Sequence, residues 1–211
     1  QEVLSAAEMR VFKIAEQGRR GRADFVPLRE AMKDAFGILQ ERYENQGNVT
    51  GLPTGFHDLD EMTAGLQPSD LIILAARPAM GKTTLALNIA EYGALKTKKA
   101  VAVFSMEMSA SQLAFRLISS IGRVNATRLR TGQLEDEDWS RVNMAIKMLS
   151  DVKVFIDDTP ALSPDVLRSK ARRIKREHDL GLIVVDYLQL MQVPGSAENR
   201  TNEISEISRS L

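Results

Sequence analysis

Short apolar runs alternate with longer amphipathic stretches over most of the chain, from Val49 onward. A continuous apolar run of four or five residues is typical of a strand buried on both faces, whereas an apolar residue at every third or fourth position is typical of a helix. The alternation therefore predicts an α/β fold, with a mostly parallel, twisted sheet flanked by helices on both faces. The predicted strands are 71–75, 101–105, 152–156 and 182–185, and the predicted helices are 82–94, 109–121, 136–150 and 164–177.

One of these helices, predicted over 136–150, carries a regular apolar stripe. Trp139, Val142, Ile146 and Leu149 repeat at helical spacing. A stripe of this kind most simply faces the interior of the protein. We therefore expect these four side chains to belong to the core.

The first 48 residues have helical periodicity but no strand-like run. We predict the tail of an N-terminal helical region and a hinge over 1–24, and a linker helix within 25–48, where Pro27 suits the first helical turn. The apolar stripe of this helix needs a partner surface, and two alternatives remain: it folds back on its own domain, or it docks on a neighbouring subunit. The stripe consists of Leu28, Met32, Ala35, Phe36, Leu39 and Tyr43.

Composition limits the classes of partner and site. The 211 residues include 28 basic and 28 acidic side chains, so any contact with nucleic acid must come from local clustering or from assembly. The lack of cysteine excludes disulfides and thiolate metal sites, and two histidines argue against a histidine-rich metal site. No apolar run is long enough for a membrane span and no signal peptide is recognisable, so we expect a cytoplasmic protein.

The two ends of the sequence indicate a piece of a longer product. The chain begins at Gln1 without a methionine, and Ile204, Ile207 and Leu211 begin an amphipathic helix at the other end. We therefore expect a domain over 49–211 that is partial, with a core that is incomplete at its C-terminal end.

A phosphate-binding loop is the most specific motif of the chain. It fits the pattern G-x-x-x-x-G-K-[ST] between a predicted strand and a predicted helix, except that Ala76 replaces the first glycine, which is compatible with the loop if its φ is negative. In such loops the backbone N–H groups wrap the phosphates, the lysine reaches the β- and γ-phosphates and the hydroxyl ligates Mg²⁺. The loop consists of Ala76, Arg77, Pro78, Ala79, Met80, Gly81, Lys82 and Thr83, and Thr84 follows it.

Two acidic side chains follow predicted strands and would lie at the same edge of a parallel sheet. Asp186 ends the apolar run 182–185, and a carboxylate at this edge can hold Mg²⁺ directly or through water. Glu107 follows the strand 101–105 and can orient or deprotonate the attacking water. The alternative for Glu107 is a surface or helix-capping glutamate, because a helix begins at Ser109.

A further acidic pair, Asp157 and Asp158, also follows a predicted strand. We expect Asp158 to cap the turn at Thr159 and Pro160, which is the more common role of such a residue. Asp157 is a candidate for assisting the metal.

Two regions are candidates for contact with nucleic acid. The helix 164–177 is crowded with Arg and Lys, but these side chains spread around several faces, so a solvated surface is favoured over a phosphate track. The loop 192–201 follows the Asp186 strand and could couple the nucleotide state to a bound strand. It contains one arginine and no aromatic residue, so by itself it is a poor platform for base stacking.

Taken together, these residues resemble the motor domain of the bacterial replicative DNA helicases of the DnaB family, which belong to the RecA-like ATPases. The match runs over almost the whole chain, and alanine at the first glycine position of the phosphate loop is usual in this family. The matching strings are 50–56 with Leu59 and Asp60 after them, 75–84, 104–108, 186–191 and 203–211.

The resemblance implies a RecA-like P-loop NTPase that binds ATP and Mg²⁺ and forms a hexameric ring around single-stranded DNA, where it unwinds the duplex at the replication fork. It assigns the activation of water to Glu107 and implies that the helix 27–44 packs on the next subunit. Primase and a helicase loader are the expected protein partners, and no membrane is involved. The loop 192–201 would face the central channel, which makes Gly195, Asn199 and Arg200 candidates for DNA contact.

The chain also departs from the family pattern. Only residues 1–17 resemble the family's N-terminal helical domain. The region after Leu211 supplies, in the family, the γ-phosphate-sensing glutamine, the arginine finger and the main DNA-gripping loop. Because an arginine finger contributes several orders of magnitude to the rate in related enzymes, we expect this piece alone to be an impaired ATPase.

Two other functions remain open at this point. The chain could be a recombinase-like or clock-type ATPase, which forms filaments or rings without unwinding DNA. It could also be a non-catalytic interaction module that holds a helicase loader, a primase or a self-assembly contact.

Overall fold

The computed structural model describes residues 26–44, 49–192, 204–205 and 207–208. The chain divides into two units, Gln1–Gly47 and Asn48–Leu211. The described part of the first unit contains one helix, α2 (Leu28–Glu44), in agreement with the predicted linker helix. The predicted helix and hinge over 1–24 lie outside the described residues. In the part of the chain that is described, no helix has the length and apolar character needed to cross a membrane.

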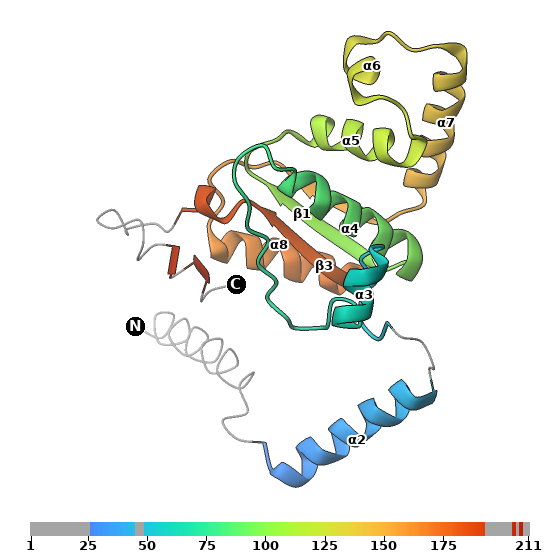
Figure 1. Cartoon of the computed structure of the whole chain (residues 1–211). Coiled ribbons are helices and arrows are strands. Elements are labelled where there is room, and N and C mark those ends of the chain that lie inside the picture. Colours follow the sequence, from blue (N-terminus) through green and yellow to red (C-terminus); the bar gives the residue numbers. More distant parts are fainter. Residues whose placement is uncertain (1–25, 45–48, 193–203, 206, 209–211) are drawn as a thin grey trace, which may run out of the picture. The chain divides into compact units, whose positions relative to one another are not determined.

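The second unit is built on a parallel sheet (Figure 1). Its strands are β1 (Ala100–Ser105), β2 (Val154–Asp157) and β3 (Leu180–Asp186), in the order β2-β1-β3. Both strand pairs are parallel. The central strand β1 is buried along its whole length, as a continuous apolar run predicts, whereas β2 and most of β3 are only partly buried. The α/β class expected from the sequence is therefore confirmed.

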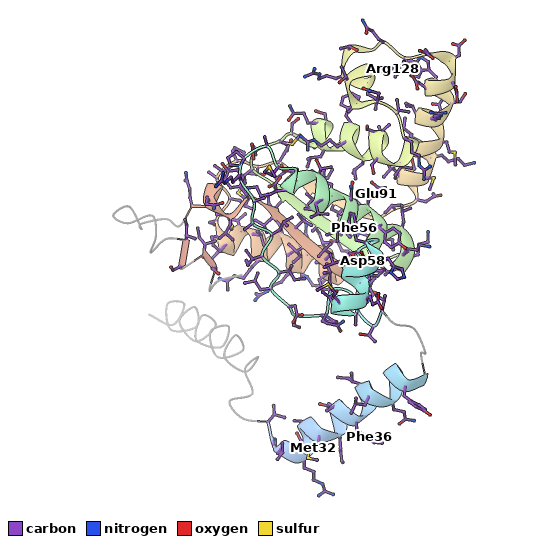
Figure 2. The ribbon with its side chains drawn as sticks, viewed as in Figure 1. Met32, Phe36, Phe56, Asp58, Glu91 and Arg128 are labelled. Atoms are coloured by element: carbon purple, nitrogen blue, oxygen red, sulfur yellow. The ribbon has the colours of Figure 1, made fainter. Side chains whose placement is uncertain are left out.

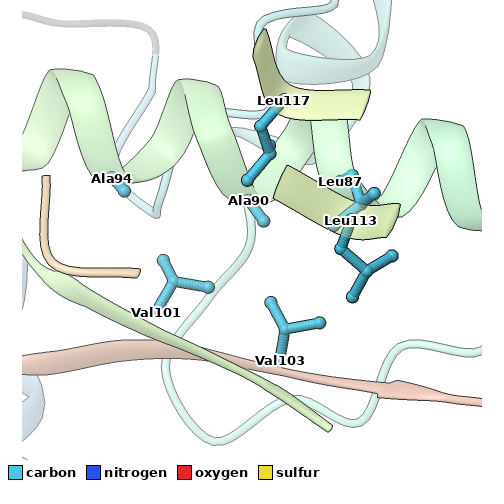
Figure 3. Close-up of a cluster of buried hydrophobic side chains, with 7 residues drawn as sticks. All are labelled: Leu87, Ala90, Ala94, Val101, Val103, Leu113 and Leu117. Carbon is cyan, nitrogen blue, oxygen red and sulfur yellow. The ribbon is translucent and has the colours of Figure 1, made fainter. Parts of the chain in front are cut away.

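Successive residues of β1 point to opposite faces of the sheet, and each face has its own core. Val101 and Val103 pack with Leu87, Ala90 and Ala94 of α4 (Lys82–Thr97), and with two leucines of α5 (Ala110–Gly122) (Figure 3). On the other face, Ala102 and Phe104 pack with Leu162, with Leu167 and Ala171 of α8 (Pro164–Glu177), and with Met191 and Ile207. One buried strand thus joins two layers of helices, which is the arrangement predicted by the alternating pattern.

The segment 71–75, which was expected to be a strand, is not one. It pairs with none of the described strands, and Figure 1 shows it as coil between α3 and α4. The four side chains from Leu71 to Leu74 are 44% to 67% exposed. A strand needs hydrogen-bonded neighbours as well as apolar side chains, and none of the described strands is paired with this segment.

The predicted helices are otherwise confirmed, and local capping explains their bounds. Ser109 and Gln112 form a capping box at the start of α5, and Ser163 caps α8, whose first residue is Pro164. α7 (Asp136–Ser150) has the predicted bounds, and α4 extends three residues beyond the predicted end. Three short elements were not predicted from the sequence: α3 (His57–Thr63), α6 (Ala126–Thr131) and the 3-10 turn η1 (Leu188–Leu190).

The buried face of α7 differs from the predicted stripe. Val142 is buried as expected, but Trp139 is 53% exposed and Ile146 is 45% exposed. The buried face instead runs through Asp138, Val142 and Ala145. A Cβ added at Gly122 of α5 would lie 3.4 Å from the Ala145 Cβ, so the two helices approach closely through small residues. This close approach turns the small side chains inward and the larger ones outward.

α6 and α7 are joined by ion pairs of Arg128, which is labelled in Figure 2. The Arg128 guanidinium lies 3.0 Å from the Glu135 carboxylate and 3.1 Å from the buried Asp138 carboxylate. The backbone N–H of Glu135, together with Arg128, lowers the pKa of Asp138 below its ordinary value. These contacts fix α6 against the first turn of α7.

A buried hydrogen-bonded pair organises the segment before α3. The Thr54 hydroxyl donates to the Asp60 carboxylate at 2.7 Å, and the backbone N–H groups of Thr54 and Gly55 donate to the same carboxylate at 2.8 and 3.1 Å. Burial alone would raise the pKa of Asp60, but these hydrogen bonds outweigh it and the net shift is downward. The carboxylate thereby holds the turn that leads into α3.

We predict that Thr54→Val lowers the free energy of unfolding by about 1–3 kcal/mol, because the buried Asp60 carboxylate loses a donor. Thr63→Val is the matched control: Thr63 is exposed on α3, and its hydroxyl donates only to the Leu59 carbonyl, so a change within about 0.5 kcal/mol is expected. Urea unfolding of both variants at neutral pH measures the difference, and equal losses would contradict the assignment.

The same pair predicts a pH dependence. Because the folded-state pKa of Asp60 is lowered, its stabilisation is present above the ordinary value of 3.8 and is lost as the pH falls through the folded-state pKa. The difference in unfolding free energy between the wild type and Thr54→Val should therefore shrink at acid pH.

Candidate functional site

The phosphate loop enters α4 directly, and its backbone is shaped for an anion. Gly81 precedes the first residue of α4 with a φ of 85°, and Ala79 has a φ of 62°. Consecutive N–H groups in such alternating conformations form a concave nest, and the helix N-terminus adds a partial positive charge. Ala76 is not among the described residues with positive φ, so alanine fits this position as expected. The loop residues before Lys82 are all exposed and face solvent.

Thr83 and Asp186, which are 103 residues apart in the chain, meet at the end of the sheet. The Thr83 hydroxyl donates a hydrogen bond to the Asp186 carboxylate at 2.7 Å. Thr83 lies in the first turn of α4, and Asp186 is the last residue of β3 and only 8% exposed. The structure thus brings together the two side chains to which the sequence assigned the metal.

Glu107 lies two residues beyond the end of β1, at the same edge of the sheet. The strand register pairs Ser105 with Asp186, and the Met106 N–H donates to the Asp186 carbonyl at 2.9 Å. The Ser105 hydroxyl accepts from the Met108 N–H and donates to the Met108 carbonyl, which closes a turn around Glu107. Within the described residues the Glu107 carboxylate is exposed and has no hydrogen-bond or ion-pair partner. Its turn is therefore fixed, while its carboxylate remains available.

Lys82 contacts an aromatic ring that the sequence analysis did not identify. Its ammonium lies 5.3 Å from the ring centroid of Tyr187, the residue after Asp186. The first two residues of α4 therefore both contact the end of β3, Lys82 through a ring face and Thr83 through a carboxylate.

The family is decided by comparison with known proteins. Residues 51–211 match the model of a family described as the DnaB-like helicase C terminal domain. The chain belongs to this family.

Curated relatives of the chain are named as replicative DNA helicases. The chain is 45% identical to the replicative DNA helicase DnaC of Bacillus subtilis and 48% identical to the replicative DNA helicase DnaB of Haemophilus influenzae. These matches cover 100% and 99% of the chain, respectively, and 46% of each relative. The chain therefore spans about half the length of the curated relatives it matches.

Solved structures of this family share the fold. A structure whose title describes an ATPase domain matches with a TM-score of 0.79 at 35% identity, over 85% of this chain and 65% of the other. A structure of a DnaB-like replicative helicase, whose title includes its interactions with primase, matches with a TM-score of 0.76 at 31% identity, over 97% of this chain and 54% of the other. The fold is thus the RecA-like α/β fold expected from the sequence.

In this DnaB-like domain a second cation lies beside the phosphate loop. The Arg116 guanidinium of α5 donates to the Thr84 hydroxyl at 3.0 Å. This contact ties α5 to the first turn of α4. No local sequence signal could have identified Arg116, because it lies in the middle of a helix 32 residues from Thr84.

The turn at Thr159 and Pro160 is not capped by Asp158 as predicted. Asp157, not Asp158, organises the turn: its carboxylate accepts from the Thr159 N–H at 3.0 Å and forms an ion pair with Lys170 of α8. Burial raises the pKa of Asp157, but Lys170 and Thr159 outweigh it and hold the pKa below its ordinary value. The Asp158 carboxylate instead accepts from the Ala110 N–H at 2.9 Å and caps the start of α5. Both carboxylates therefore have partners within the fold, and the assistance of Asp157 at the metal stays a prediction.

The basic helix α8 is partly neutralised by its neighbours. Lys170 pairs with Asp157, and Arg168 and Lys175 pair with Asp165 and Asp179. Arg172, Arg173 and Arg176 are exposed. The favoured interpretation of a solvated surface stays a prediction. The other candidate for DNA contact, with Gly195, Asn199 and Arg200, lies outside the described residues.

A recess of about 250 Å³ lies apart from the phosphate loop. No sequence pattern predicted this recess, and none of the phosphate-loop residues lines it. Its lining consists of Val49, Pro53, Gly55, His57, Asp60, Glu61 and Tyr92.

Proposed function

We propose that this chain is the motor part of a replicative DNA helicase subunit. The subunit hydrolyses ATP at the interfaces of a hexameric ring, translocates on single-stranded DNA and unwinds the duplex at the replication fork. The observation that carries the proposal is the hydrogen bond between the Thr83 hydroxyl and the Asp186 carboxylate beside the phosphate loop. The names of the relatives support it, although the chain spans less than half of their length.

ATP is the proposed substrate, held by the loop from Ala76 to Thr84. The nest at Ala79 and Gly81 suits the phosphates, and the Lys82 ammonium balances their charge. The protein groups also fit Mg²⁺, because the Thr83 hydroxyl and the Asp186 carboxylate supply adjacent hard oxygen atoms. The described residues contain no group of three or more acidic or histidine side chains that could hold a metal ion, and these two side chains would be the protein's share of the site. When bound, the ion would neutralise charge that develops on the phosphates.

Glu107 is the proposed general base. A carboxylate in this role must be free to accept a proton from water and must sit on a rigid support. The exposed Glu107 side chain meets the first condition, and the turn closed by Ser105 and Met108 meets the second. Glu107 would orient the attacking water and take its proton.

The linker helix α2 is the proposed contact between subunits. Its stripe is exposed, with Phe36 at 68%, Leu39 at 62% and Tyr43 at 86%. Apolar residues at this spacing suit a groove on another protein surface, and we assign that surface to the second unit of a neighbouring copy. Single-stranded DNA, primase and a helicase loader are further proposed partners, in a cytoplasmic setting. The channel contact with DNA is proposed for Gly195, Asn199 and Arg200.

We predict that Lys82→Ala lowers ATP hydrolysis by the full-length protein at least about 100-fold, because a charge that stabilises the transferring phosphoryl group is lost. Lys147→Ala, an exposed lysine on α7, is the matched control and should hydrolyse ATP at the wild-type rate. Phosphate release measures both. Wild-type hydrolysis by Lys82→Ala would exclude this loop as the ATP site.

We predict that Glu107→Gln binds ATP within about twofold of the wild type but turns it over about 10²–10⁴ times more slowly, since glutamine keeps the shape and cannot take a proton. Glu177→Gln, at the exposed end of α8, is the control. Nucleotide titration and single-turnover hydrolysis separate binding from chemistry. A normal turnover rate would remove Glu107 from its role.

We predict that Phe36→Asp shifts the full-length protein from hexamers to smaller species and abolishes unwinding of forked DNA, because a charge would enter the apolar contact of α2. Gly37→Asp adds the same charge at the next position, where a new Cβ meets no atom within 4 Å, and should leave assembly intact. Light scattering after size-exclusion chromatography distinguishes the two. Intact hexamers of Phe36→Asp would rule out this docking face.

A further inference from the structure

Two neighbouring contacts join the start of α4 to the end of β3. The Thr83 hydroxyl is 2.7 Å from the Asp186 carboxylate, and the Lys82 ammonium is 5.3 Å from the ring centroid of Tyr187. The first contact joins the groups that the proposed function assigns to the metal. The second contact has no role in that proposal, although it involves the lysine that reaches the phosphates.

The ring of Tyr187 is held on a rigid support. Its neighbour Asp186 is buried and ends β3, and the Tyr187 carbonyl accepts from the Leu190 N–H at 2.9 Å, which closes the turn of η1. Tyr187 itself is half-buried, and its hydroxyl has no hydrogen-bond partner among the described residues. The ring face, rather than the hydroxyl, is therefore the part of this side chain that meets Lys82.

A lysine side chain has a flexible four-carbon stem and loses much rotamer freedom when its ammonium is fixed. An ammonium over the face of a tyrosine is attracted by the ring quadrupole, without a charge that would neutralise it. Such a contact can confine Lys82 near the phosphate loop and still leave its full positive charge for a phosphate. A carboxylate partner would compete with the phosphates for the same charge.

We propose that Tyr187 is a positioning residue, whose ring holds the Lys82 ammonium at the phosphate loop before a nucleotide binds. This inference rests on the proposed function of the loop, because it concerns how the same lysine meets a triphosphate. Its consequence is a lower entropy cost of binding, so the ring contributes to nucleotide affinity more than to the chemical step.

The test compares Tyr187→Leu and Tyr187→Phe in the full-length protein, with Tyr92→Leu as the control. Tyr92 forms the other Lys-over-Tyr contact of the described residues, with Lys96 at 5.7 Å and on α4 alone, so its loss should not change nucleotide binding. Tyr187→Leu should raise the dissociation constant for a fluorescent ADP, and the KM for ATP, about twofold to fivefold, with a smaller change in kcat. Tyr187→Phe keeps the ring face and should recover most of the lost affinity.

A double-mutant cycle separates positioning from a structural effect. In a Lys82→Ala background, Tyr187→Leu should weaken ADP binding no further, because the side chain that the ring holds is gone. Equal losses in both backgrounds, unchanged affinity of Tyr187→Leu, or a Tyr187→Phe variant as weak as Tyr187→Leu would each overturn the proposal. If Lys82→Ala weakens binding but Tyr187→Leu does not, only this inference fails. If Lys82→Ala itself has no effect on binding or hydrolysis, the proposed function of the loop fails with it.

Discussion

The hydrogen bond between Thr83 and Asp186 is the contact on which the site depends. It joins the first turn of α4 to the last residue of β3, across 103 residues of sequence. Because Asp186 is buried at the sheet edge, the helix that follows the phosphate loop cannot shift without disturbing a buried carboxylate. The loop itself is exposed and has few contacts of its own, so its placement comes from this anchor and from the packing of α4 on β1. An exposed loop that leads into a fixed helix gives a phosphate site whose amides have a defined direction.

The central strand β1 pairs with the strand that bears Asp186 and leads to the turn that bears Glu107. Its two faces bury separate cores, so its position is fixed from both sides. The register with β3 places Ser105 beside Asp186, and Glu107 follows two residues later. The distance between the proposed base and the proposed metal ligand is thus set by strand pairing, which is stiffer than a contact between two loops. Arg116 and Asp158 then fix α5, so the turn that bears Glu107 is held at both ends.

The elements and residues with a strong local signature could be predicted from the sequence. The predictions were wrong where a contact with a residue distant in the sequence determines the structure. The helix bounds of α7 and α8 follow from local caps and periodicity, and the phosphate loop follows from its motif. The run 71–75 has the composition of a strand, but pairing is a property of two segments and cannot be read from one. On α7, the close approach of Gly122 and Ala145 selected the buried face and left Trp139 outside. Asp157 rather than Asp158 holds the turn, and Asp158 caps α5, because their partners Lys170 and the Ala110 N–H lie on other elements.

Tyr187 illustrates the same limit at the site itself. A tyrosine after a strand-ending aspartate has no signature of its own, and its relation to Lys82 appears only when β3 and α4 are placed side by side. The functional groups at this edge of the sheet also differ in whether they already have a hydrogen-bond or charge partner. Thr83 and Asp186 satisfy each other, Lys82 rests against an uncharged ring, and the Glu107 carboxylate has no partner among the described residues. Lys82, whose charge must act on the phosphates, and Glu107, which must accept a proton, are therefore the groups that the fold leaves without a charged partner among the described residues, whereas Thr83 and Asp186 are held by their hydrogen bond.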